Sequence, residues 1–184
     1  GTRNHFALDL GLDRDRPASR LVAFINGVLR TIDYPTVNAK LFVNNASFGF
    51  HASRVQNHSY RDAELHTTLD VLPVVMAADT APYDLHLRLP SGEEVSGSIV
   101  LLVSNNPYIT DSLLGIGQRP TLDSGHLGGL VITGPTAASP TTPSSESTES
   151  RSHGGLQRFT ATELQVTSSS PKIAVGIDGE TVHV

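Results

Sequence analysis

The chain has 184 residues, of which 38% are hydrophobic and 5% aromatic, and its formal net charge is −5. This length suits one domain with a core large enough to fold independently. The negative charge argues against a sequence-independent nucleic-acid-binding protein, and the absence of cysteine excludes disulfides and thiolate metal sites. No apolar run reaches the roughly 18 residues of a membrane span and no signal segment opens the chain, so a cytoplasmic protein is expected.

The first 27 residues are expected to form a helical entry segment. Residues 4–10 have apolar side chains at helical spacing, and Gly11 is placed where a helix would stop. A second helix is expected from Asp15 to Gly27, because Pro17 suits the first helical turn and the apolar residues after it form one face.

After the second helix the apolar pattern changes from helical to strand-like. Residues 28–32 and 41–43 are expected to pair as a hairpin, and residues 44–50 to continue as a strand whose small residues allow close backbone approach. A short or kinked helix is expected over residues 64–78, where Pro73 interrupts the apolar spacing.

The clearest strand pair lies in the middle of the chain. Residues 83–89 alternate between polar and apolar, residues 90–93 are typical of a turn, and residues 95–104 form the returning strand. Three later runs are further expected strands: 126–133, 160–168 and 172–177.

A polar tract separates two of these strands. Residues 134–155 are dominated by Ser, Thr and Pro and contain no aliphatic side chain larger than Ala, so we expect a flexible loop. The whole pattern predicts a mainly β fold with a few helices, an α+β chain that forms an antiparallel β-sandwich-like domain.

Five short motifs follow one another along the chain. It opens on Gly-Thr-Arg-Asn-His-Phe-Ala (1–7) and continues with Asn-Asn-Ala-Ser-Phe-Gly (44–49) and Asn-Asn-Pro (105–107). Leu-Asp-Ser-Gly (122–125) and Ile-Asp-Gly-Glu (177–180) come later. In this order the motifs resemble those of the diacylglycerol-kinase-type lipid kinases, a group that includes sphingosine kinases and, more distantly, NAD kinases.

The resemblance covers nearly the whole chain and implies a domain assignment. Residues 1–184 would be the second, C-terminal domain of a two-domain lipid kinase, because the family's Gly-Gly-Asp-Gly-Thr phosphate loop does not occur in the sequence. The N-terminal nucleotide-binding domain would be absent, and this fragment alone would be inactive. The resemblance implies ATP and Mg²⁺ as cofactors of the full-length protein, a lipid substrate and peripheral contact with a membrane. Strand edges make a homodimer conceivable.

The same resemblance implies the roles of four residues. Glu180 would accept the proton of the lipid hydroxyl during phosphoryl transfer, and Asp178 would support it or act through a metal. From the residues alone, the Asp178 position is instead typical of a hairpin turn. Thr2 and Asn4 would contact the nucleotide, and the alternative for both is helix capping. His5 stands where the family usually has Asp.

A further turn resembles the family's Leu-Asp-Asp-Gly turn, which binds Mg²⁺ away from the reaction centre. The matching metal positions are Thr121, Ser124 and His126, and Ser124 replaces the expected carboxylate. Because a neutral hydroxyl is a poor ligand for a hard cation, we expect this metal site to be weak or lost. Asp123 is then expected to cap the turn.

A second function, of a different class, stays open at this point. The chain could be a non-catalytic β-sandwich that binds a hydrophobic ligand or a partner protein, and the Ser124 and His5 departures favour that alternative.

Overall fold

The computed structural model describes residues 5–12, 21–49, 84–109, 119–133 and 155–184. Helix α1 spans His5–Asp9. Gly11 terminates the helical turn that follows, because its φ of +73° allows the Leu12 amide to donate to the Ala7 carbonyl. This is a helix end with glycine in the left-handed region, as predicted. Helix α2 (Val22–Asn26) follows, and within the described ranges no helix has the length and apolar character needed to span a membrane.

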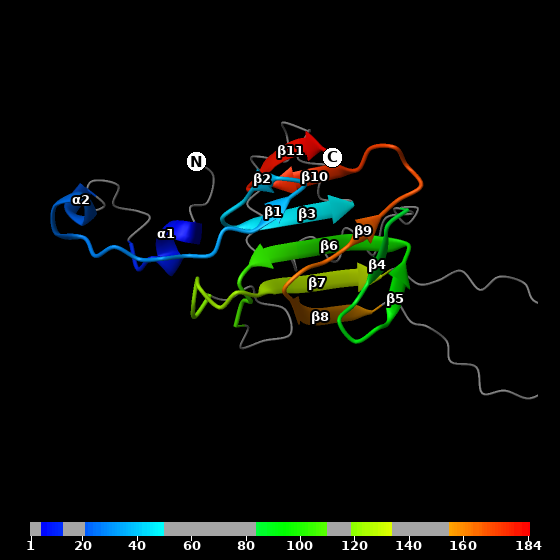
Figure 1. Ribbon diagram of the computed structural model, residues 1–184, viewed down its shortest axis with the longest axis horizontal. Helices are drawn as coiled ribbons and strands as arrows, with labels where there is room; N and C mark the ends of the chain where they lie inside the picture. The colour runs from blue at the N-terminus through cyan, green and yellow to red at the C-terminus, as the bar shows by residue number, and fades with distance from the viewer. Residues whose placement is uncertain (1–4, 13–20, 50–83, 110–118, 134–154) are drawn as a thin grey trace, which may run out of the picture.

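Six strands form one antiparallel sheet with the order β11-β10-β3-β6-β7-β8 (Figure 1). The strands are β3 (Asn45–Gly49), β6 (Ser98–Asn105), β7 (Leu127–Thr133), β8 (Leu156–Ala161), β10 (Ala174–Ile177) and β11 (Glu180–His183). The sheet therefore pairs β3 with β10, although more than half of the chain lies between them in sequence.

Two smaller sheets complete the β structure. Strands β5 (Glu94–Ser96), β4 (His86–Arg88) and β9 (Val166–Thr167) form an antiparallel sheet in that order, and β1 (Thr36–Val37) pairs with β2 (Lys40–Leu41).

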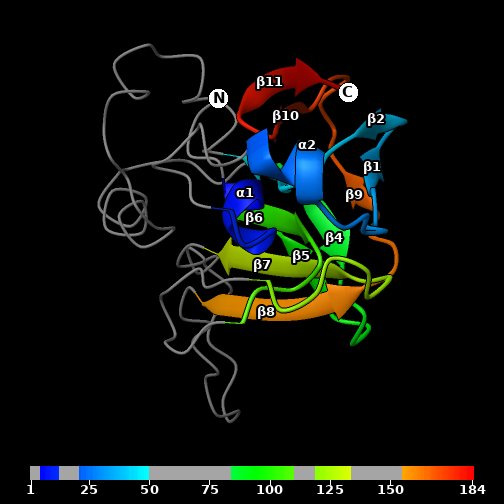
Figure 2. The same cartoon turned by 90° about the vertical axis from the view of Figure 1, so that its left-hand side faces the viewer.

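The core lies between the two larger sheets (Figure 1; Figure 2). Leu85, Leu87 and Leu89 are buried on one side of the β4 segment, whereas the residues between them are exposed. They pack with buried side chains of the six-stranded sheet, namely Ala46, Phe48, Leu101, Val103, Val131 and Val175. Each such Leu contributes about 1.5–3 kcal/mol of apolar burial, so this interface holds the sandwich together.

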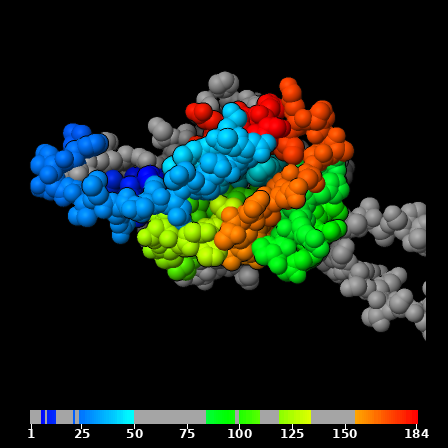
Figure 3. All heavy atoms as spheres, viewed as in Figure 1, coloured from blue at the N-terminus to red at the C-terminus, as the bar shows by residue number. Residues whose placement is uncertain are grey.

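The predicted mainly β class is confirmed, but the first predicted strand is wrong. Residues 28–32 form no strand, and the hairpin runs from Thr36 to Leu41 around Asn38 and Ala39, which both have positive φ. An alternating or apolar run becomes a strand only beside a hydrogen-bonding neighbour, and this segment extends away from the sandwich (Figure 3). Its Leu29 side chain is 100% exposed.

Two other predicted strands are each divided between the sheets. The run 95–104 breaks at Gly97, whose φ is +65°, so that β5 joins the small sheet and β6 the large one. The run 160–168 likewise contains the end of β8 and all of β9, which lie in different sheets. Strand β11 was not predicted. Apolar alternation shows which side chains face inward, but it does not show which strand is the neighbour.

Several predictions concern residues that the structure does not describe. These are Thr2 and Asn4, the first part of the second helix, the helix expected at 64–78 and nearly all of the polar tract at 134–155.

Candidate functional site

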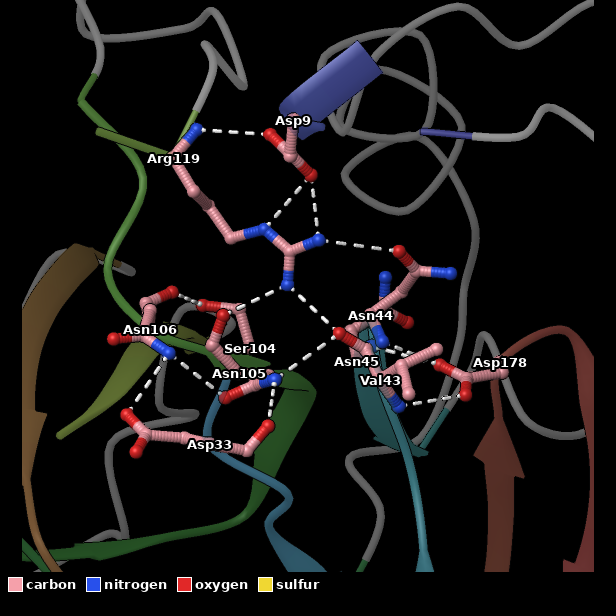
Figure 4. Close-up of polar contacts among 10 residues, drawn as sticks. All are labelled: Asp9, Asp33, Val43, Asn44, Asn45, Ser104, Asn105, Asn106, Arg119 and Asp178. Carbon is pink, nitrogen blue, oxygen red and sulfur yellow. Dashed lines mark hydrogen bonds and ion pairs between the residues drawn. The ribbon is translucent and has the colours of Figure 1, made fainter. Parts of the chain in front are cut away.

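Polar side chains gather at one end of the six-stranded sheet, where β3 and β7 begin and β6 and β10 end (Figure 1). Figure 4 shows this cluster, which joins α1, the residues before β3, the end of β6 and the β10–β11 turn. It contains residues from three of the segments that carry the family-like motifs, namely 44–49, 105–107 and 177–180.

Arg119 is the centre of the cluster. Its side chain is 0% exposed and that of Asp9, on α1, is 3% exposed, and the two form an ion pair. The guanidinium also donates to the carbonyls of Val43 and Asn105, each at 2.8 Å, and to the Asn44 side-chain oxygen at 3.3 Å. Nε and one Nη2 hydrogen donate to the Asp9 carboxylate, so all five N–H donors of the guanidinium form hydrogen bonds. Arg119 therefore fastens α1 to the sheet.

Asp178 occupies the two-residue turn between β10 and β11. Its φ is +48° and that of Gly179 is +92°, the pair of positive values typical of a tight hairpin turn. The Asp178 carboxylate accepts hydrogen bonds from the backbone amides of Val43 at 2.8 Å, Asn44 at 2.8 Å and Asn45 at 3.1 Å (Figure 4). Both carboxylate oxygens are thus engaged with the segment that leads into β3.

Glu180 follows that turn as the first residue of β11, and its side chain is exposed. It pairs with Ile177, which pairs in turn with Ala46, so these three residues share one face of the sheet. Unlike the Asp178 carboxylate, that of Glu180 accepts no hydrogen bond from the residues that the structure describes.

The turn with the expected metal ligands is closed by protein groups. The Thr121 hydroxyl bonds the Asp123 carboxylate, and the Ser124 amide and hydroxyl both donate to the Asn106 side-chain oxygen. His126 Nδ1 lies 2.7 Å from the Ser124 carbonyl. Nowhere in the described ranges do three or more His, Asp or Glu residues come together as a metal would require. The donor set does not fit a hard cation.

A cavity of about 340 Å³ lies beside this end of the sheet. The cross-strand trio Leu102, Leu130 and Arg158 lines it, so it lies on the face opposite the sandwich core. Its other lining residues are Ser104, Pro107, Tyr108, Gly128, Gly129, Phe159 and Thr160.

Tyr108 joins the cavity to the polar cluster. Its ring centroid is 5.5 Å from the Arg119 Cζ atom. Burial raises the pKa of the Tyr108 phenol, against the opposing effects of the Arg119 charge and of a hydrogen bond with Asn45. Gly128 allows Pro107, the residue before Tyr108, to pack closely against β7, because a Cβ at position 128 would lie 2.7 Å from the Pro107 Cα atom. The Gly-Gly pair inside an apolar strand was the available sequence signal for this close approach.

Asp178 and Glu180 were predicted from the sequence as site residues, whereas Arg119, Asp9 and Tyr108 were not. The structure brings the 44–49, 105–107 and 177–180 motifs together, and Asn106 links them to the 122–125 turn. Thr2 and Asn4 lie outside the described residues.

No protein-family model and no curated protein matches the chain. Solved structures from Bacillus anthracis share its fold. One is of a diacylglycerol kinase, with a TM-score of 0.53 and 14% sequence identity. Two are of proteins assigned as diacylglycerol kinases, with TM-scores of 0.58 and 0.59 and identities of 17% and 16%.

The three matches each cover 100% of this chain, which spans 58% to 61% of the length of those structures. The fold is therefore that found in diacylglycerol kinase structures, over somewhat more than half of their length.

Proposed function

We propose that the chain is the C-terminal domain of an ATP-dependent lipid kinase, which transfers the γ-phosphate of ATP to a lipid hydroxyl. One observation carries this proposal: the whole chain has the fold of diacylglycerol kinase structures. The meeting of three family-like motifs at one end of the sheet supports it (Figure 4).

Glu180 is the proposed proton acceptor. As the lipid oxygen bonds to the γ-phosphorus and the bond to the ADP oxygen breaks, the hydroxyl proton passes to the Glu180 carboxylate. Asp178 supports Glu180 through the backbone, because its carboxylate fixes the turn against the amides that precede β3. This contact needs no metal.

The nucleotide would bind mainly outside this chain. Thr2 and Asn4, just before α1, are proposed contacts to ATP, whose bound Mg²⁺ supplies charge neutralisation at the triphosphate. The buried Arg119–Asp9 pair would keep α1 in a fixed position relative to the Glu180 turn.

The cavity beside Tyr108 lies on the face of the sheet opposite the one that Glu180 shares with Ala46, so we do not assign it to the lipid on which Glu180 would act. Its volume of about 340 Å³ and the side chains of Leu102 and Leu130 suit an apolar group. A lipid substrate also implies peripheral contact with a membrane surface.

The test is transfer of radiolabelled phosphate from ATP to a panel of lipids by the full-length protein. Glu180→Gln should lower transfer by about 10²–10⁴-fold, the usual contribution of a general base. Glu163→Gln, at another exposed carboxylate, is the matched control and should be as active as the wild type. Full activity of Glu180→Gln would refute the assignment of the base.

The cavity favours a second candidate, a non-catalytic domain that binds a hydrophobic ligand. Two results together would favour this candidate over the kinase. The protein would bind a fluorescent fatty acid saturably, and Leu130→Asp would weaken that binding. The folded protein with Mg²⁺ would transfer no phosphate to any lipid.

A further inference from the structure

The turn from Thr121 to His126 is held by a buried amide. Asn106 is 0% exposed and has a φ of +66°, a left-handed conformation that Asn tolerates. Its Nδ2 donates to Asn105 Oδ1 at 2.9 Å and to Asp33 Oδ2 at 3.2 Å. Two acceptors on that side fix the orientation of the amide, so Oδ1 faces the turn and accepts from the Ser124 amide at 2.8 Å and from its hydroxyl.

Asp33 holds the same turn from its other side. Its Oδ2 atom accepts a hydrogen bond from the Gly125 amide at 2.7 Å. Its own backbone amide donates to the Leu122 carbonyl at 2.7 Å. Asp33 and Asn106 therefore contact three residues of the turn, namely Leu122, Ser124 and Gly125.

Ser124 must be a donor at this position. A carboxylate at residue 124 would place its oxygens against Asn106 Oδ1 and close to the Asp33 carboxylate, with no proton between them. Such a group of oxygens is stable only with a cation, which is the usual partner of clustered carboxylates. The serine hydroxyl supplies the missing hydrogen from within the protein.

We infer that Asn106 and Asp33, acting on Ser124 and Gly125, hold this turn in the place that the resemblance gives to Mg²⁺. The turn is then independent of divalent cations, and the residue at position 124 decides this property. The inference does not depend on the kinase proposal, because it concerns only how the turn is held.

Thermal unfolding of the 184-residue chain tests the inference, in EDTA and in millimolar MgCl₂ with the ionic strength matched by KCl. The wild-type Tm should be the same in both buffers. Ser124→Ala should lower it by about 2–4 °C in both, as expected for one lost hydrogen bond in a chain of this size. Ser124→Asp should lower it further in EDTA and regain most of the loss in MgCl₂.

Two more variants make the result specific. Adding Asp33→Asn to Ser124→Asp should abolish the recovery in MgCl₂, because the second carboxylate of the new oxygen group is removed. Asn106→Asp should also become cation-dependent, because it places a carboxylate beside Asp33.

Either of two outcomes would overturn the inference. If MgCl₂ raises the wild-type Tm and Asp123→Asn removes this rise, the native turn binds the cation. Equal stability of Ser124→Asp and wild type in EDTA would show that the Ser124–Asn106 contact does not hold the turn. Failure of Ser124→Asp to fold in EDTA, with folding restored by MgCl₂, would support it.

Discussion

The two acidic turns look alike in sequence, yet they are held in opposite ways. In the β10–β11 turn the Asp178 side chain reaches outward and bonds three backbone amides of another segment. In the other turn Asp123 is exposed and, among the described residues, bonds only Thr121 two positions before it, while distant residues hold the backbone. An Asp beside Ser or Gly therefore identifies a turn, but only contacts from other elements show what its carboxylate does.

The largest expected effect comes from Arg119, which bonds the carbonyls of Val43 and Asn105 beside the residues that hold the two turns. Arg119→Met leaves the buried Asp9 carboxylate unpaired and should lower the free energy of unfolding by about 3–5 kcal/mol in urea titrations. Adding Asp9→Leu removes the orphaned charge and should recover much of that loss. A cost below about 1 kcal/mol for the single variant would show that the ion pair does not fasten α1 to the sheet.

The comparison itself is tested by removing each turn carboxylate. Asp178→Ala leaves three backbone amides without their acceptor and should cost about 2–3 kcal/mol of unfolding free energy. Asp178→Asn keeps one acceptor and tolerates the positive φ, so about 1 kcal/mol is expected. Asp123→Ala should stay within about 0.5 kcal/mol of wild type. Equal costs for the two alanine variants would remove the distinction.

The smallest effect is expected at a third carboxylate, Asp84, which is exposed on the small sheet. The hydroxyl of Ser169, then its backbone amide, and then His86 lower the pKa of Asp84 from 3.8 to about 2. Because the folded-state pKa is depressed, the contribution to stability is present above pH 3.8 and is lost as the pH falls through about 2.

Asp84→Asn should accordingly flatten the fall in Tm over this acidic range and leave neutral pH nearly unchanged. Glu163→Gln is the control at another exposed acid. Identical pH profiles for wild type and Asp84→Asn would contradict the prediction.

Local chemistry was predictable from the sequence, whereas partners distant in sequence were not. The Gly11 helix end, the alternation around Leu87 and the turn at Asp178 all follow from short-range rules, and the structure contains each of them. The division at Gly97 was missed, although Ser96, Gly97 and Ser98 interrupt the apolar run, because the sequence does not show that the neighbouring strand changes there.

The candidate site shows the same limit. Arg119 carries no sequence signal of burial, and its partner Asp9 lies 110 residues away. The Asn106–Ser124 contact depends on the side-chain orientation that Asp33 imposes from a third segment. Such groups become recognisable only when the fold has brought the three segments together.

The bonds from Asp178 to residues 43–45 span 133 to 135 positions of the sequence, which sets an order of events during synthesis. A ribosome adds about 5–20 residues per second, so β3 exists for on the order of ten seconds before β10 is made. Throughout that interval one edge of β3 has unpaired backbone groups and can pair with other chains. We therefore expect slower translation to prolong this exposure of β3 and to lower the yield of folded protein.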